Sequence, residues 1–362
     1  MTVSPHIVST QRLHAMQVLR AYAAAMVVFV HAISTYADKV DSSVFVVLPF
    51  GLGELGVKLF FCISGFIIYN STMHMNHNFT STVVFLKRRL IRVVPLYWLA
   101  TTIYAIKLLL QGVSLSLQNF LYSLFFIPYS SENGLMRPIL GVGWTLNYEM
   151  FFYCLFGVIL LLQARWRIFF LTIIFLLLIG LRNYDFITLD GGFLERCLYL
   201  LSDYYLFYFL LGIIVAVVKK RLASTAVNIG LTFRLSLFLS TALLLLYILA
   251  ALYLHPQPGW TEIIMAVVCC ISLAVCAFEK QIIGYRGKLG KLAELAGNAS
   301  YSTYLTHGFV LGPMARLIYI ANLKFPPLLF AFLMVFVATF AGIVVYRFIE
   351  QPLLNKLREK LS

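Results

Sequence analysis

Long apolar segments dominate this chain and restrict it to a membrane fold. Hydrophobic residues make up 61% of its 362 residues, and charged residues only 12%. A soluble core cannot bury that much apolar surface, whereas a helix of about 20 apolar residues crosses the hydrocarbon layer of a bilayer. The apolar segments do not alternate with a period of two, which argues against a membrane β-barrel. The sequence therefore predicts an all-α integral membrane protein.

Apolar runs between polar breaks predict ten transmembrane helices. They cover residues 16–36, 48–69, 91–110, 142–162, 167–181, 198–218, 235–254, 261–278, 300–320 and 328–349. Basic residues gather in the loops of one side, as in KRRLIR at 87–92 and KKR at 219–221, and the other loops are neutral or acidic. Because positive loops stay inside, both termini are predicted to be cytoplasmic. No loop is long enough to fold alone, so we expect one transmembrane domain over residues 1–362.

The net charge of +14 comes from 28 Lys and Arg against 14 Asp and Glu. In a membrane protein this excess is typical of cytoplasmic loops beside anionic lipids, so we expect membrane lipids as partners and no nucleic acid. The six cysteines lie in or beside apolar segments, without the spacing of a disulfide framework or a zinc site. No metal ion is expected.

Arg20 and His31 stand eleven residues apart in the first apolar segment. Eleven helical residues make about three turns, so both side chains share one face and lie about 16 Å apart along the axis. One interpretation makes His31 a general base or proton carrier, because imidazole titrates near neutral pH. In the alternative, Arg20 extends to the lipid headgroups and His31 only hydrogen-bonds a neighbouring helix.

Glu149 lies inside the fourth predicted span, at roughly the depth expected for His31. A carboxylate beside a histidine fixes the ring tautomer and stabilises the charged ring, so we predict that Glu149 orients His31. A structural glutamate that accepts hydrogen bonds from tyrosines or the backbone is the alternative. His307, in the ninth span, either lines the same cavity or ties two helices together. An ion pair with Glu54, four residues earlier, explains Lys58.

An Arg-Arg-x-x-Arg pattern, formed by Arg88, Arg89 and Arg92, leads into the third span. Residues three apart share a helix face, so Arg89 and Arg92 can hold one phosphate group between their guanidinium groups. The alternative is a basic cluster that contacts lipid headgroups only.

Five segments in a fixed order give the chain a family resemblance. They are LRAYAAAMVVFVHA, GVKLFFCISGFIIY, FLKRRLIRVVPLYW, GVGWTLNYEMFFYCLF and GNASYSTYLTHGF. Together they resemble the membrane acyltransferase-3 family, and the version LNYEMFFY is most similar to the branch that acetylates exopolysaccharides and their lipid-linked repeat units. The chain departs from the family pattern at Lys58, where relatives usually carry an acidic residue, and at Thr306, where Trp is common.

The resemblance implies a ten-helix enzyme of the bacterial inner membrane. Such an enzyme moves an acetyl or other short acyl group from cytoplasmic acyl-CoA, usually acetyl-CoA, to a hydroxyl of a cell-surface, secreted or lipid-linked carbohydrate. An ion-coupled transporter or flippase for a lipid-linked glycan is the alternative, with Arg20, His31 and Glu149 as an ion-coupling chain. The phosphate-binding arginine pair favours the enzyme. The sequence leaves open whether the chain forms a homo-oligomer.

The resemblance also assigns roles to residues of this chain. The family's essential arginine and histidine correspond to Arg20 and His31, its arginine pair to Arg89 and Arg92, and its intramembrane carboxylate to Glu149. The expected catalytic residues are His31 and Glu149. The residues expected to bind acyl-CoA are Arg20, Arg88, Arg89 and Arg92. The candidates for the acceptor side are Trp144, Tyr148, Tyr153 and His307.

Overall fold

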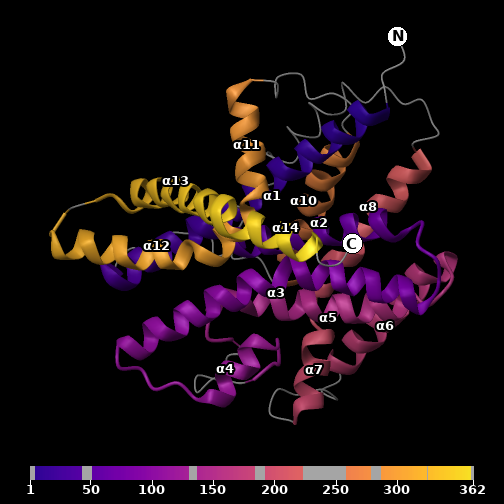
Figure 1. Cartoon of the computed structure of the whole chain (residues 1–362), viewed down its shortest axis with the longest axis horizontal. Helices are drawn as coiled ribbons and strands as arrows, with labels where there is room; N and C mark the ends of the chain where they lie inside the picture. The colour runs from indigo at the N-terminus through magenta and orange to yellow at the C-terminus, as the bar shows by residue number, and fades with distance from the viewer. Residues whose placement is uncertain are drawn as a thin grey trace. The chain divides into compact units, whose positions relative to one another are not determined.

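A computed structural model describes residues 5–42, 51–129, 137–183, 192–222, 258–278, 287–323 and 325–359 (Figure 1). All regular secondary structure in these ranges is helical, which confirms the predicted all-α class for this part of the chain. The span predicted at residues 235–254 lies outside the described residues.

Six of the described helices are long and apolar enough to cross a membrane. They include α1 (Pro5–Lys39), α2 (Gly51–Thr72), α3 (Phe79–Leu110), α6 (Ala164–Asn183) and α10 (Pro258–Phe278). The sixth is α13 (Pro327–Val345), which continues through a π-helical turn (Tyr346–Glu350) into α14 (Gln351–Glu359). Such a set of helices is that of a multi-pass membrane protein.

A bent pair of helices adds a seventh crossing if it forms one broken span. α7 (Phe193–Leu201) and α8 (Tyr205–Leu222) meet at 42°. The spans predicted at 142–162 and 300–320 are also helical, as α5 (Trp144–Ile159) and α12 (Ser300–Ile320). The count of ten spans and the cytoplasmic termini stay predictions.

The chain divides into two compact units. The first contains Met1–Ile67 and Leu211–Phe348, and the second contains Ile68–Leu210 and Ile349–Ser362.

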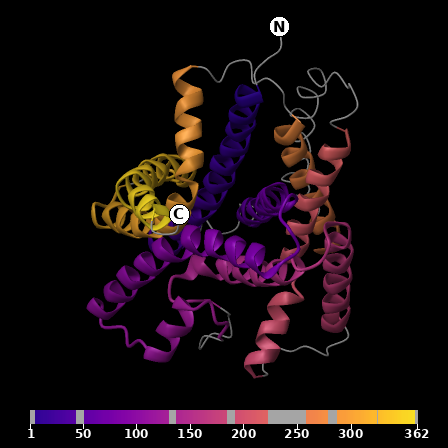
Figure 2. The same ribbon diagram turned by 45° about the vertical axis from the view of Figure 1, so that its right-hand side comes forward.

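In the first unit, α1 packs against α10, α12, α13 and the short helix α11 (Lys288–Asn298). Its core joins Val28, Ala32 and Tyr36 of α1 to apolar residues of α12 and α13. The Tyr36 hydroxyl donates a 2.6 Å hydrogen bond to the Phe325 carbonyl. α12 and α13 run side by side (Figure 1, Figure 2), and α1 lies against this helix pair.

In the second unit, α3 packs against α5 and against the short helix α4 (Leu117–Leu124). The Thr82 hydroxyl of α3 donates to the Gly157 carbonyl of α5 at 2.9 Å. Arg167, at the start of α6, is only 6% exposed and donates to the carbonyls of Thr72, Met75, Leu160 and Leu162. These carbonyls lie at or just after the C-terminal ends of α2 and α5. The last four carbonyls of a helix have no hydrogen-bond partner within that helix. Arg167 therefore closes the ends of two helices at once.

Gly342 tests the close approach of α12 and α13. A Cβ at this position would lie 2.6 Å from the Thr303 Cα and 2.8 Å from its Cβ, so an alanine would push the helices apart. We expect Gly342→Ala to lower the free energy of unfolding by about 1–3 kcal/mol, as overpacking does. Thermal unfolding of the purified protein in detergent measures the change.

The matched control for this prediction is Gly308→Ala on α12, where an added Cβ has no atom within 4 Å. This variant should unfold at or above the temperature of the native protein, because alanine is the better helix former. Equal unfolding temperatures for the two variants would contradict the proposed role of the close contact.

Candidate functional site

His31 and His307 form a hydrogen-bonded pair in the first unit. The Nδ1 atom of His31 lies 2.7 Å from the Nε2 atom of His307, and the two rings stack with centroids 5.0 Å apart. The other ring nitrogen of His307, Nδ1, lies 2.7 Å from the Tyr304 carbonyl oxygen. His307 is only 1% exposed, and His31 is half-buried. The sequence left two interpretations of His307 open, and the structure places it directly against the predicted base.

Arg20 lies on the same helix as His31 and is buried, with 8% of its surface exposed. Its Nη1 atom donates a 3.2 Å hydrogen bond to the Gln17 side chain. An arginine that only extends into the headgroup layer would keep its guanidinium group accessible. The burial of Arg20 favours a role inside the protein.

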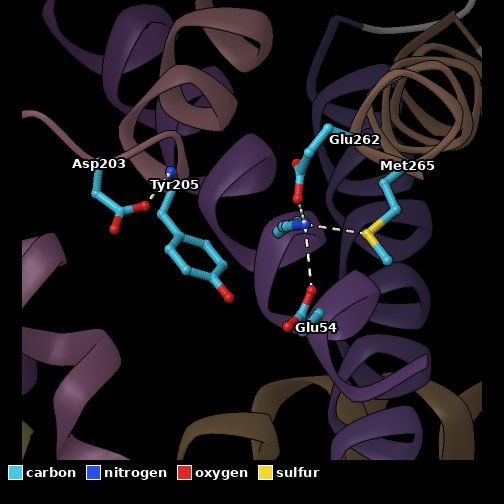
Figure 3. Close-up of polar contacts among 6 residues, drawn as sticks. Glu54, Asp203, Tyr205, Glu262 and Met265 are labelled. Atoms are coloured by element: carbon cyan, nitrogen blue, oxygen red, sulfur yellow. Dashed lines mark hydrogen bonds and ion pairs between the residues drawn. The ribbon is translucent and has the colours of Figure 1, made fainter. Parts of the chain in front are cut away.

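Lys58 is a second buried charge of the first unit, with 2% exposure. The predicted pair with Glu54 is present at 3.4 Å, and the shorter contact, 2.6 Å, is to Glu262 of α10. Figure 3 shows Glu54, Glu262 and Met265 around the ammonium group, which also lies 3.0 Å from the Met265 Sδ. Sequence reasoning missed Glu262 because no spacing relates it to Lys58. The only sign of this partner in the sequence is that Glu262 is a charged residue in the first turns of an apolar helix.

The three candidate phosphate-binding arginines lie on α3 in the second unit. Arg88 is exposed, and Arg89 and Arg92 are half-buried. The Arg89 guanidinium group lies 5.6 Å from the ring centre of Phe85 and 5.8 Å from that of Tyr153, and its Nη2 donates to the Ser71 hydroxyl. Its Nε atom is buried and has no hydrogen-bond partner among the described residues. Arg89 as a whole is only half-buried, so its guanidinium group can contact an anion.

Glu149 of α5 is half-buried and accepts a hydrogen bond from the Tyr153 hydroxyl. Because Tyr153 also lies under Arg89, the second unit contains a chain from the guanidinium group through the phenol to the carboxylate. A bond from a tyrosine is what the structural interpretation of Glu149 predicted. Glu149 and His31 belong to different units, so their pairing stays a prediction.

The aromatic candidates for the acceptor side fall into separate places. Trp144 packs edge-on against Tyr148 and Tyr205, and these two tyrosines contact each other at a tilt, with ring centres 5.2–5.8 Å apart. Tyr153 lies instead against Arg89, and His307 belongs to the first unit against His31.

An ion pair borders the aromatic cluster of Trp144, Tyr148 and Tyr205. Asp203 accepts hydrogen bonds from the Tyr148 hydroxyl at 3.1 Å and from Arg182 at 3.0 Å, and its other oxygen accepts from the Tyr205 backbone N–H (Figure 3). Arg182 also donates to the Tyr199 hydroxyl. No motif or spacing in the sequence singles out Arg182 or Asp203. The available signal was a charged residue at each break between apolar helices.

The two units offer two kinds of chemistry. The histidine pair of the first unit can accept and hold a proton, and the arginines of the second unit can bind an anion such as a phosphate. Within the described ranges, no three His, Cys, Asp or Glu side chains gather as metal ligands.

A multi-pass helical protein with a histidine pair and an arginine cluster fits the class of membrane acyltransferases, and comparison with known proteins establishes the family. Residues 13–347 match the family described as Acyltransferase domain. The chain is 30% identical over 317 residues to the exopolysaccharide production protein ExoZ of Rhizobium meliloti (strain 1021). The aligned residues cover 86% of this chain and 92% of that protein. No solved structure matches the chain.

The chain therefore belongs to the acyltransferase-3 family and is an acyltransferase. The resemblance inferred from five sequence segments is confirmed, including its similarity to the exopolysaccharide branch. The match is to an acyltransferase family, so it favours the enzyme over the alternative of a transporter or flippase.

The Lys58 cluster predicts an asymmetric effect of removing its charges. Glu262→Leu leaves a buried ammonium group with the longer Glu54 contact, and should lower the free energy of unfolding by about 1–3 kcal/mol. Lys58→Met should cost less, because Glu54 and Glu262 lie near the starts of α2 and α10 and their side chains are 50% and 42% exposed, whereas the ammonium group is buried. Thermal unfolding compares the two variants.

The double variant Lys58→Met, Glu262→Leu is the control, since it removes the pair together. It should be more stable than Glu262→Leu alone. A double variant that is no more stable would show that the ammonium group does not depend on Glu262.

Proposed function

We propose that this chain is an inner-membrane O-acetyltransferase for an exopolysaccharide. It moves an acetyl or other short acyl group from cytoplasmic acyl-CoA to a hydroxyl group of the polysaccharide or of its lipid-linked repeat unit. Family membership and the name of the relative support acyl transfer and exopolysaccharide production. The single observation that carries the choice of donor is the pair of half-buried arginines on α3, Arg89 and Arg92, whose guanidinium groups suit a phosphate.

The arginines of α3 would bind the phosphates of CoA. Arg89 has its aromatic neighbours to hold the guanidinium plane, and Arg92, three residues later, shares its helix face. Exposed Arg88 would add positive charge at the entrance, and Arg20 is a further proposed contact of acyl-CoA. In the predicted topology of ten spans with cytoplasmic termini, the α3 arginines face the cytoplasm, where acyl-CoA is available.

His31 would act as the general base. Its imidazole removes the proton of a sugar hydroxyl as the oxygen attacks the thioester carbon, and the carbon–sulfur bond breaks to release CoA. The proton held by His31 then passes to the departing thiolate. Glu149 would be the carboxylate that stabilises the charged ring. Trp144 and Tyr148 remain the candidates for the acceptor side, because Tyr153 lies against Arg89 and His307 lies against His31.

Donor binding is tested by thermal stabilisation with CoA. A ligand present at about 100 times its Kd stabilises the folded protein by about 2.7 kcal/mol, so CoA or acetyl-CoA should raise the unfolding temperature. The double variant Arg89→Ala, Arg92→Ala should lose this effect.

Arg165→Ala is the control for charge, because it removes an exposed arginine outside the candidate site. Its stabilisation by CoA should match that of the native protein. A native protein that does not respond to CoA would rule out an acyl-CoA donor.

The role of His31 is tested with His31→Ala. Cells that lack the native gene and express this variant should lose the acyl mass from their surface glycans, as measured by mass spectrometry, because no base remains to activate the hydroxyl. The purified variant should still be stabilised by CoA, since the phosphate-binding residues are intact. Glycans that keep their acyl groups would refute the role of His31.

A further inference from the structure

We infer that His307 is a positioning residue that fixes the tautomer of His31 and leaves Nε2 of His31 as the basic atom. The inference rests on the proposed function for its role in catalysis, because His31 is the base of that proposal. The contacts that carry it form a chain from the Tyr304 carbonyl through His307 to His31.

The first step assigns the proton on His307. A carbonyl oxygen only accepts hydrogen bonds, so the nitrogen that lies 2.7 Å from the Tyr304 oxygen must be an N–H donor. That nitrogen is Nδ1. In a neutral imidazole the other nitrogen, Nε2, then carries the lone pair.

The second step assigns the proton on His31. A charged ring at His307 would have to be desolvated almost completely, because this residue is only 1% exposed, and its near neighbour is a second imidazole that gives it no negative charge. With His307 neutral, its Nε2 accepts, and the Nδ1 atom of His31 must donate across the 2.7 Å contact. The lone pair of neutral His31 is therefore on Nε2.

This arrangement prepares His31 for general base catalysis. When Nε2 takes a proton, the ring becomes an imidazolium, and the bond from Nδ1–H to His307 becomes charge-assisted and stronger. His307 also occupies the nitrogen through which a carboxylate would fix the same tautomer. The tautomer role therefore falls to His307.

The surrounding packing makes His307 a rigid support. Tyr304 and His307 lie one turn apart on α12, so the anchoring carbonyl belongs to the same helix. Val28 and Ala32 of α1 and Leu311 of α12 belong to one buried cluster, which holds the two helices together beside the histidine pair. Positioning residues on packed helices keep catalytic geometry better than residues on loops.

Two amide variants of His307 separate its two hydrogen bonds. In His307→Gln the amide reaches the position of Nε2, and its oxygen can accept from Nδ1–H of His31. In His307→Asn the shorter amide reaches only the position of Nδ1, where it can donate to the Tyr304 carbonyl. The pair is matched in chemistry, and each member keeps one bond of the chain.

We expect the two variants to differ in the initial rate of acyl incorporation into surface glycan, measured in membrane vesicles supplied with radiolabelled acetyl-CoA. His307→Gln should retain the rate within about tenfold, and His307→Asn should lose about 100-fold or more, as loss of general base catalysis does. CoA should stabilise both variants equally. Equal rates for the two variants, at equal thermal stability, would overturn the inference.

The tautomer is read directly by NMR of the purified native protein labelled with ¹⁵N-histidine, with the His31 signals assigned from their loss in His31→Gln. A protonated Nδ1 and a lone pair on Nε2 support the inference, and the opposite tautomer overturns it. This readout needs no acyl transfer. If vesicles of the native protein transfer no acyl group, the proposed function fails while the spectrum still decides the tautomer.

Discussion

Buried polar side chains in apolar helices must find their partners within the protein, and the structure depends on this constraint. The hydrocarbon layer supplies no water to solvate an imidazole or an ammonium group, so an unsatisfied group there costs several kcal/mol (about 2–7). His307 meets the constraint with His31 and the Tyr304 carbonyl, Lys58 with Glu262, and Arg167 with four backbone carbonyls. These contacts join helices that apolar packing alone would leave free to slide.

The same constraint separates polar groups that are satisfied from groups that remain available for a substrate. The guanidinium group of Arg167 donates all of its observed hydrogen bonds to backbone carbonyls, and its role is structural. Arg89 uses one donor on Ser71, lies against two aromatic rings and keeps its buried Nε without a partner among the described residues. Both belong to short segments with a second arginine nearby, Arg167 in the first turn of α6 and Arg89 at the eleventh residue of α3. Their hydrogen bonds, and not their positions in the chain, distinguish the anchor from the candidate ligand-binding residue.

Much of the candidate site follows from the sequence because it depends on local geometry. The shared face of Arg20 and His31, the Arg89 and Arg92 pair and the Lys58 contact with Glu54 all arise from residues of one helix, whose positions the helical repeat sets. Partners from other helices do not follow in this way. His307 stands 276 residues after His31, and Glu262 stands 204 residues after Lys58. The sequence left the role of His307 open and gave no reason to choose Glu262.

The sequence by itself determined the all-α membrane class, the helical positions of the predicted base and arginines, and the acyltransferase family, because apolar length, helical periodicity and motif order are all one-dimensional properties. Only the tertiary structure decided that His307 contacts His31, that Glu262 is the nearer partner of Lys58, and that Tyr153 of α5 lies against Arg89 of α3. The physical reason is that helix packing brings together side chains that no sequence spacing relates. A hydrogen bond needs its two atoms within about 3 Å, and packing alone sets that distance.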